Sequence, residues 1–123
     1  MQNDKEKFKK EFIQRLIRHS IKAIKFADKL RLERVSFTII DQFIDAITSI
    51  GANVVEAKSS HSTKDYIKFF EISLKSANET KYWLIIIKEI TTQNKSEAEE
   101  ILKETIEIAN ILASSVMTLK GKK

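Results

Sequence analysis

The sequence predicts an all-α protein, folded as an antiparallel up-down-up-down four-helix bundle. The 123 residues include no proline and only two glycines, so the residues that usually interrupt strands and turns are missing. Apolar residues instead recur at three- and four-residue spacings in four segments, which is typical of amphipathic helices. Short connections make successive helices antiparallel, and a chain of this length forms one domain, residues 1–123, with a sizeable core.

The first helix is predicted at about 4–31. Asn3 with Glu6 makes a suitable capping box, and apolar residues follow at Phe12, Leu16, Ala23, Ala27 and Leu30. The end of this helix is poorly marked, because residues 30–36 contain neither Gly nor Pro. Ser36 is the best available cap for the second helix, which is predicted at about 35–58.

Gly51 lies inside the second predicted helix, in the run "ITSIGANVVEA". Apolar residues keep helical spacing through this run without a phase break: Ile40, Phe43, Ile47, Ile50, Val54 and Ala57. One continuous helix is therefore favoured over a hairpin. At about 100° per residue, Gly51 falls within the apolar stripe, where its missing side chain would let another helix pack closely. That packing has to offset a helix-propensity cost of about 1 kcal/mol relative to Ala.

The opposite face of the second helix is polar and unusually small, with Asp45, Ser49, Ala52 and Glu56 on it and Asn53 at its flank. A solvated face is the simpler interpretation for an isolated helix. The alternative is a second contact surface, in which Ser49, Asn53 and Glu56 meet a neighbouring subunit.

The third and fourth helices are predicted at about 63–90 and 96–119. Ser62 with Asp65 caps the third helix after the loop "SSHST", and Ser96 with Glu99 forms a capping box for the fourth. Residues 120–123, "KGKK", are expected to form a flexible basic tail.

The last third of the third helix is apolar in every direction, because residues 82–87 read "YWLIII". One bundle core cannot cover all of these side chains, and exposed apolar patches often mark interfaces. We therefore expect a homo-oligomer with Tyr82, Trp83 and Ile86 at the subunit contact. Burial of Trp83 and Ile86 under a loop is the alternative.

Five cations repeat at three-four spacing on the first helix and are called the basic stripe: Arg15, Arg18, Lys22, Lys25 and Lys29. Residues 1–34 carry eleven Lys or Arg against five Asp or Glu, a net charge of +6 in a chain of net charge +5. The basic stripe is expected diametrically opposite Leu16, Ala23 and Ala27. In an oligomer it would form a positive ring or groove that binds RNA or DNA through phosphates, largely without sequence preference. A merely solvated face is the alternative, and a membrane surface is disfavoured because the apolar side is needed for the core.

Signals for catalysis, cofactors and metals are missing from the sequence. There is no cysteine and no Gly-rich phosphate loop, and Leu16 and Lys58 stand where a di-iron bundle would need Glu before His19 and His61. His19 is expected at a helix flank and His61 in a loop. We therefore expect a non-enzyme without cofactor or metal, in the cytoplasm, with neither a signal peptide nor a membrane span.

Residues 41–87, "DQFIDAITSIGANVVEAKSSHSTKDYIKFFEISLKSANETKYWLIII", resemble a family of small bacterial four-helix-bundle proteins encoded by intervening sequences inside 23S rRNA genes. The resemblance covers about residues 30–120. It rests on ordered blocks: "SIGAN" with "EA", Ser62 to Asp65, "SLKSANETKYWL" and "ANILASSVMTLKGK".

The resemblance implies a bundle that assembles into a ring, typically a pentamer, with a basic surface. It also implies kinship to the accessory protein of diversity-generating retroelements, which is thought to bind nucleic acid and a reverse transcriptase. The family's signature residues here would build the fold and ring: Gly51, Asn53, Glu56, Asp65, Glu79, Tyr82 and Trp83. Two departures are the lack of a Pro near Arg31 and the acidic Asp45 where relatives commonly carry a basic residue.

Two functional hypotheses follow. The first is a homo-oligomeric nucleic-acid-binding accessory protein that uses the basic stripe. The second is a protein-interaction scaffold that docks a partner protein and has no nucleic-acid role.

Overall fold

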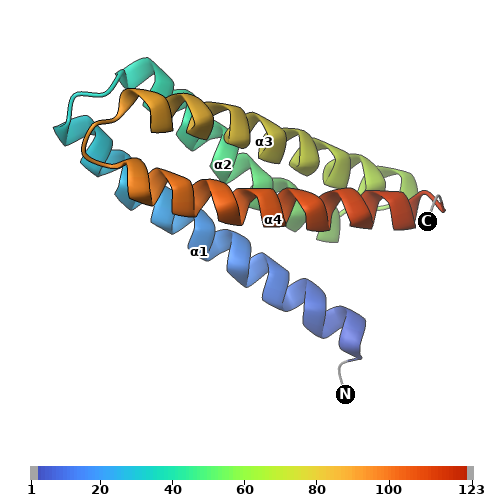
Figure 1. Cartoon of the computed structure of the whole chain (residues 1–123). Helices are drawn as coiled ribbons and strands as arrows, with labels where there is room; N and C mark the ends of the chain where they lie inside the picture. The colour runs from blue at the N-terminus through green and yellow to red at the C-terminus, as the bar shows by residue number, and fades with distance from the viewer. Residues whose placement is uncertain (1–2, 122–123) are drawn as a thin grey trace.

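The chain forms four helices that pack against one another (Figure 1). The computed structural model describes residues 3–121, and no strand occurs in that range. The helices are α1 (Asp4–Leu32), α2 (Phe37–Lys58), α3 (Thr63–Ile90) and α4 (Lys95–Leu119). These bounds differ from the expected ones by two residues at the start of α2 and by one residue at the end of α1 and the start of α4. Of the expected tail, residues 122–123 lie outside the described range, and Lys120 pairs with Glu71.

The helices are not equally close to one another along their length. α2 packs on α3 and α3 on α4, whereas α1 packs mainly on α2 and diverges from α4 toward its N-terminus (Figure 1). The connections 33–36 and 91–94 lie at one end of the molecule, called here the closed end. The first turns of α1 and the last turns of α4 lie at the other, called here the open end.

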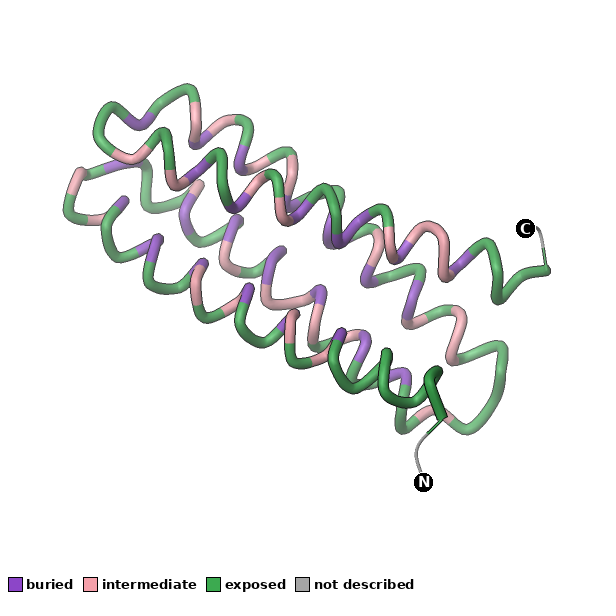
Figure 2. Tube along the Cα trace, turned by 60° about the horizontal axis from the view of Figure 1, so that its bottom comes forward, coloured by how far each residue is buried: buried purple, intermediate pink, exposed green. Residues whose placement is uncertain are grey.

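The core runs between the helices, and buried positions recur along their inner faces (Figure 2). Phe26 and Phe43 meet edge to face, with ring centroids 6.1 Å apart, and join α1 to α2. A Cβ built on Gly51 would lie 3.3 Å from the Cβ of Leu16, which is tighter than ordinary packing. The glycine in the apolar stripe thus lies where α1 crosses α2 closely.

Three helices begin at side-chain caps. Asn3 Oδ1 accepts from the Glu6 N–H at 2.8 Å, Ser36 Oγ from Ile39 N–H at 3.3 Å, and Ser62 Oγ from Asp65 N–H at 3.1 Å. The capping box expected at Ser96 and Glu99 is wrong. α4 begins one residue before Ser96, and the N-cap residue Asn94 makes no side-chain cap; its Nδ2 donates to Glu33 at 2.8 Å instead.

The junction after α1 is closed without Gly or Pro. Arg34 adopts φ +66° and its backbone N–H donates to Arg31, while the Val35 N–H donates to the Leu30 carbonyl at 3.0 Å. This is a Schellman motif with an arginine at the left-handed position that Gly usually occupies. Val35 and Leu30 are both buried, which supplies the apolar contact of the motif.

Glu33 fixes the closed end by binding the α3–α4 connection. Its carboxylate accepts from the Thr91 hydroxyl at 2.5 Å and from the backbone N–H groups of Thr92 and Gln93 at 2.6 and 3.1 Å. These hydrogen bonds, with Thr91 the largest contributor, lower the pKa of Glu33 from 4.5 to about 2.

In the part of the chain that the structure describes, no helix is both long enough and apolar enough to cross a membrane. In that same part, no cluster of three or more His, Cys, Asp or Glu side chains is arranged to hold a metal ion.

Candidate nucleic-acid and subunit interfaces

The basic stripe of α1 lies beside α4, and three of its five cations pair with glutamates there. Arg15 Nε lies 3.1 Å from a Glu104 oxygen, and its terminal nitrogen lies 2.8 Å from Glu107. Lys29 Nζ lies 2.7 Å from Glu97. The contact between Lys22 Nζ and Glu100 is longer, 3.9 Å. These pairs link α1 to α4 and give three cations a carboxylate partner, while the side chains of Lys22 and Lys29 stay 43% and 57% exposed.

The basic stripe is expected diametrically opposite Leu16, Ala23 and Ala27, but it does not lie opposite the buried face as a whole. The buried face of α1 also includes His19 and Phe26, which extend it around the helix toward the basic stripe. At about 100° per residue, this places the centre of the stripe about 110° from the centre of the buried face rather than 180°. The matching acidic residues on α4 follow the same three-four spacing: Glu97, Glu100, Glu104 and Glu107. That spacing was readable in the sequence.

Arg18 and Lys25 form the outer edge of the basic stripe. Both are exposed, and neither makes an ion pair with any residue in 3–121. They are seven residues, about two helical turns, apart, and each is rotated by about 40° from the paired cation that follows it by four residues, Lys22 or Lys29. These two side chains are the stripe positions that have no carboxylate partner in that range.

His19 is buried between α1 and α4, with 1% of its surface exposed, so the expectation of a flank position is wrong. Its Nδ1 lies 3.2 Å from Glu104 and its Nε2 lies 2.9 Å from the Thr105 hydroxyl. Burial lowers the pKa of His19 below 6.5, although the Glu104 carboxylate opposes that shift. Glu104 keeps a lowered pKa because the hydrogen bonds and charges of Arg15 and His19 outweigh its own partial burial.

This Glu–His–Thr arrangement has the residue types of a nucleophilic triad but not its accessibility. Thr105 is fully buried, and its hydroxyl lies 2.7 Å from the Ile101 carbonyl of its own helix. A nucleophile has to reach a substrate carbonyl or phosphorus. The arrangement is instead a buried polar contact that fixes the register of α1 on α4.

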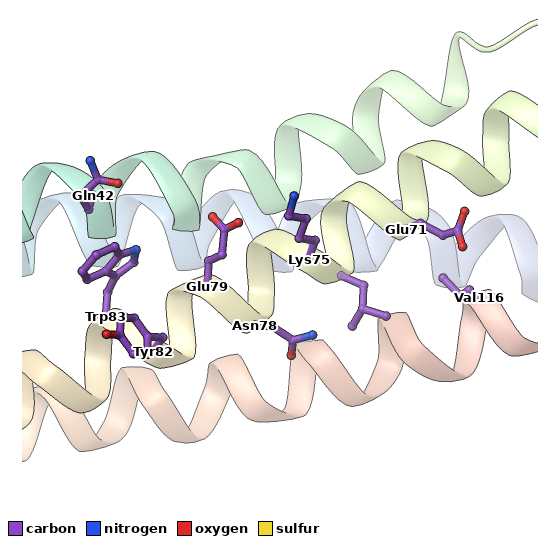
Figure 3. A pocket seen from close by; sticks show the side chains of 9 residues that line it. Gln42, Glu71, Lys75, Asn78, Glu79, Tyr82, Trp83 and Val116 are labelled. Atoms are coloured by element: carbon purple, nitrogen blue, oxygen red, sulfur yellow. The ribbon is translucent and has the colours of Figure 1, made fainter.

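The outer face of α3 carries a shallow groove of about 790 Å³, bordered by α2 and α4 (Figure 3). Tyr82 and Trp83 lie at one end of it, with ring centroids 5.1 Å apart. Tyr82 is 59% exposed, whereas Trp83 is half-buried and packs against the core. The rest of the lining is mixed: Leu74 and Val116 are apolar, and the polar residues are Gln42, Glu71, Lys75, Asn78 and Glu79.

The other expected interface residues are divided between the interior and the surface. Ile86 is half-buried on α3. The Asn53 amide donates to the Ser49 carbonyl at 2.8 Å, and Ser76 Oγ of α3 lies 3.0 Å from Ser49 Oγ. Ser49 therefore takes part in polar contacts between α2 and α3 of the same chain. Glu56 is exposed.

A family model described as 23S rRNA-intervening sequence protein matches residues 9–114, which is most of the chain. The chain belongs to the 23S rRNA-intervening sequence protein family. The match spans all four helices, and it includes Gly51 at the α1–α2 crossing and the Tyr82–Trp83 end of the groove.

A solved structure supports the same assignment. This family member is similar to a protein of unknown function from the S23 ribosomal protein family of Bacteroides thetaiotaomicron, with 31% identity and a TM-score of 0.78. The similarity covers 88% of this chain and 96% of that one, so the helical fold is shared over nearly the full length of both. No match is found among curated proteins.

Proposed function

We propose that this family member is a non-enzymatic, homo-oligomeric, cytoplasmic protein that binds RNA or DNA through cations of α1. The observation that carries the proposal is the position of Arg18 and Lys25. Both are exposed on one edge of α1, and neither has a carboxylate partner in residues 3–121. Unpaired cations at helical spacing suit the regular phosphates of a nucleic-acid backbone.

Arg15, Lys22 and Lys29 have a different role in this proposal. Because each pairs with a glutamate of α4, their main contribution is to hold the two helices together. Lys22 has the longest of these contacts and is the one most easily drawn to a phosphate. The proposed binding edge is therefore narrower than the basic stripe.

Oligomerisation would allow the two cations of each chain, Arg18 and Lys25, to bind nucleic acid with useful affinity. Two free cations in one chain give weak binding, whereas several copies on one ring present them at a high effective concentration to a single nucleic acid. We propose that antiparallel bundles assemble through the groove on α3, where Tyr82 supplies exposed aromatic surface. A ring of five subunits is the form that the family resemblance favours.

The test is fluorescence anisotropy of a labelled structured RNA and a labelled DNA duplex, titrated at several salt concentrations. The variant Arg18→Glu/Lys25→Glu should lose binding, and its folding should be unchanged because no ion pair within the described range is broken. The matched control, Lys68→Glu/Lys103→Glu, changes two exposed lysines of α3 and α4 that likewise make no ion pair in that range. It applies the same change in net charge and should retain most of the affinity.

The salt dependence of binding distinguishes contacts at a local site from attraction by the overall net charge. If Arg18 and Lys25 each neutralise a phosphate, their removal lowers the slope of log K against log salt by about one per contact. Equal loss in both double variants would show that only net charge matters. Unchanged affinity in Arg18→Glu/Lys25→Glu would contradict the proposed edge.

A second candidate function is docking of a protein partner, and the groove of α3 favours it. An aromatic end beside Lys75, Asn78 and Glu79 can anchor a peptide through Tyr82 while polar groups fix its register. This candidate predicts negligible affinity for RNA and DNA even at low salt. It also predicts one defined partner whose binding is lost in Tyr82→Ala and kept in Arg18→Glu/Lys25→Glu.

A further inference from the structure

We propose that a cleft at the open end of the bundle binds a single-chain anionic amphiphile, with its tail between the helices and its head group on lysines. The cleft has a volume of about 450 Å³. Its apolar lining comes from all four helices and includes Phe8, Phe12, Val54, Tyr66, Phe70 and Leu119. The proposal is independent of nucleic-acid binding.

The cleft exists because α1 diverges from α4 toward its N-terminus (Figure 1). Two stacked aromatic pairs form its walls. Phe8 stacks on Phe12 along α1, with ring centroids 6.0 Å apart, and Tyr66 stacks on Phe70 along α3, with centroids 5.0 Å apart. Phe12 and Phe70 are buried at the base, while Phe8 is 52% exposed at the mouth. The walls thus offer a graded apolar surface from mouth to base.

The charges around the cleft are all of one sign. Lys5, Lys9 and Lys58 line it, and none of them makes an ion pair with a residue in 3–121. Lys9 reaches from α1 to α3, where its Nζ lies 5.0 Å from the centroid of the Tyr66 ring. No Asp or Glu is among the described residues that line the cleft. An apolar cavity bordered by three cations that have no carboxylate partner in residues 3–121 selects a ligand that has one apolar part and one anionic part.

Size and symmetry also favour a small molecule. The volume lies in the range of about 300–1,000 Å³ that is usual for small-ligand pockets. A second copy docked here across a two-fold axis would bring Lys5, Lys9 and Lys58 against the same three lysines, and like charges held together are unfavourable; the ring proposed above uses the groove on α3 instead. Hydroxyl groups of Ser115 and Thr118 on the α4 side can hydrogen-bond the head group.

The probe is decanoate, titrated into the full chain by isothermal calorimetry. We expect saturable binding with one site per chain. Decanol has the same tail without charge and should bind about tenfold more weakly. Each partly exposed charge contact contributes less than a tenfold change in affinity, and the few contacts together contribute about tenfold. Decyltrimethylammonium, with the opposite charge, should not bind at this site.

Two kinds of variant test the location. Lys9→Gln/Lys58→Gln should weaken decanoate about tenfold and leave decanol unchanged. The control Lys75→Gln/Lys103→Gln removes two lysines outside the cleft and should bind as the parent does. Ser115→Phe fills the cavity and should abolish binding of both probes. Thr118→Phe, at an exposed position of the same wall, replaces it if Ser115→Phe does not fold.

Three results would overturn the proposal. The first is equal affinity for decanoate, decanol and decyltrimethylammonium, which would indicate nonspecific partitioning. The second is decanoate binding that survives both the lysine substitutions and the filled cavity. The third is the absence of saturable binding to a folded parent protein.

Discussion

Nδ1 of His19 lies 3.2 Å from Oε1 of Glu104, so a buried imidazole of α1 is in direct contact with a carboxylate of α4. The carboxylate is shared, because Arg15 also contacts Glu104. The charge of Glu104 therefore favours the protonated imidazole, whereas burial, which removes its hydration, disfavours it. Burial dominates, and the pKa of His19 is lowered.

This contact predicts that acidification destabilises the fold in the range where the unfolded histidine gains a proton. With a folded-state pKa below the ordinary 6.5, the unfolded state binds more protons, so stability rises with pH through this window. The slope for one group is at most about 1.4 kcal/mol per pH unit. Urea unfolding from pH 7.5 down to 5.5 should show the loss.

The control uses the two histidines of the chain. His19→Gln should abolish the slope in this window, whereas His61→Gln, in the exposed connection between α2 and α3, should leave it unchanged. Stability that rises on acidification through the same window would mean that Glu104 raises the pKa of His19 more than burial lowers it.

Glu33 predicts a separate loss of stability in stronger acid. Its folded-state pKa of about 2 is below the ordinary 4.5, so its contribution is fully present above pH 4.5 and is lost as the pH falls toward 2. Glu33→Gln should remove this dependence. In hydrogen exchange near neutral pH, the amides of Thr92 and Gln93 should exchange faster in this variant, because both donate to the carboxylate. Glu89→Gln, which removes an exposed carboxylate of α3, should leave those amides as in the parent.

The local rules of helix formation placed most helix ends, and long-range contacts explain the exceptions. Asn3, Ser36 and Ser62 cap their helices as the sequence predicts, since an N-cap depends only on residues three positions away. Ser96 does not, because α4 begins at Lys95, after an Asn94 whose side chain donates to Glu33, 61 residues earlier. No local pattern contains that contact.

The surface chemistry was harder to predict for the same reason. Periodicity identified the basic stripe correctly as a row of cations, but its orientation depends on where α4 lies. His19 belongs to the buried face only because Thr105 and Glu104 meet it from that helix. The matching spacing of Glu97, Glu100, Glu104 and Glu107 was the one available signal in the sequence.

The approach of Gly51 to Leu16 predicts that Gly51→Ala destabilises the protein in spite of its better helix propensity. Alanine contributes about 1 kcal/mol in helix propensity, but its Cβ would lie 3.3 Å from the Cβ of a fully buried Leu16. Overpacking of a core costs about 1–3 kcal/mol, so a net loss of up to about 2 kcal/mol is expected in urea denaturation. The adjacent Ala52→Gly, on the exposed face, should lose about 1 kcal/mol through propensity alone. A stabilised Gly51→Ala would mean that α1 can shift away without cost.

Tyr82 gives the most direct test of self-association, because it is 59% exposed and its substitution leaves the core of one chain intact. Trp83 is less suitable, since it packs against that core. Aromatic anchors at interfaces often contribute about 2 kcal/mol or more, so in the proposed assembly Tyr82→Arg should cause dissociation into single chains. Sedimentation velocity measures the assembly, and circular dichroism checks that helix content is retained. Leu32→Arg is the matched control, because Leu32 is 87% exposed at the closed end and away from the groove. An unchanged sedimentation coefficient in Tyr82→Arg would place the subunit contact on another face of the bundle.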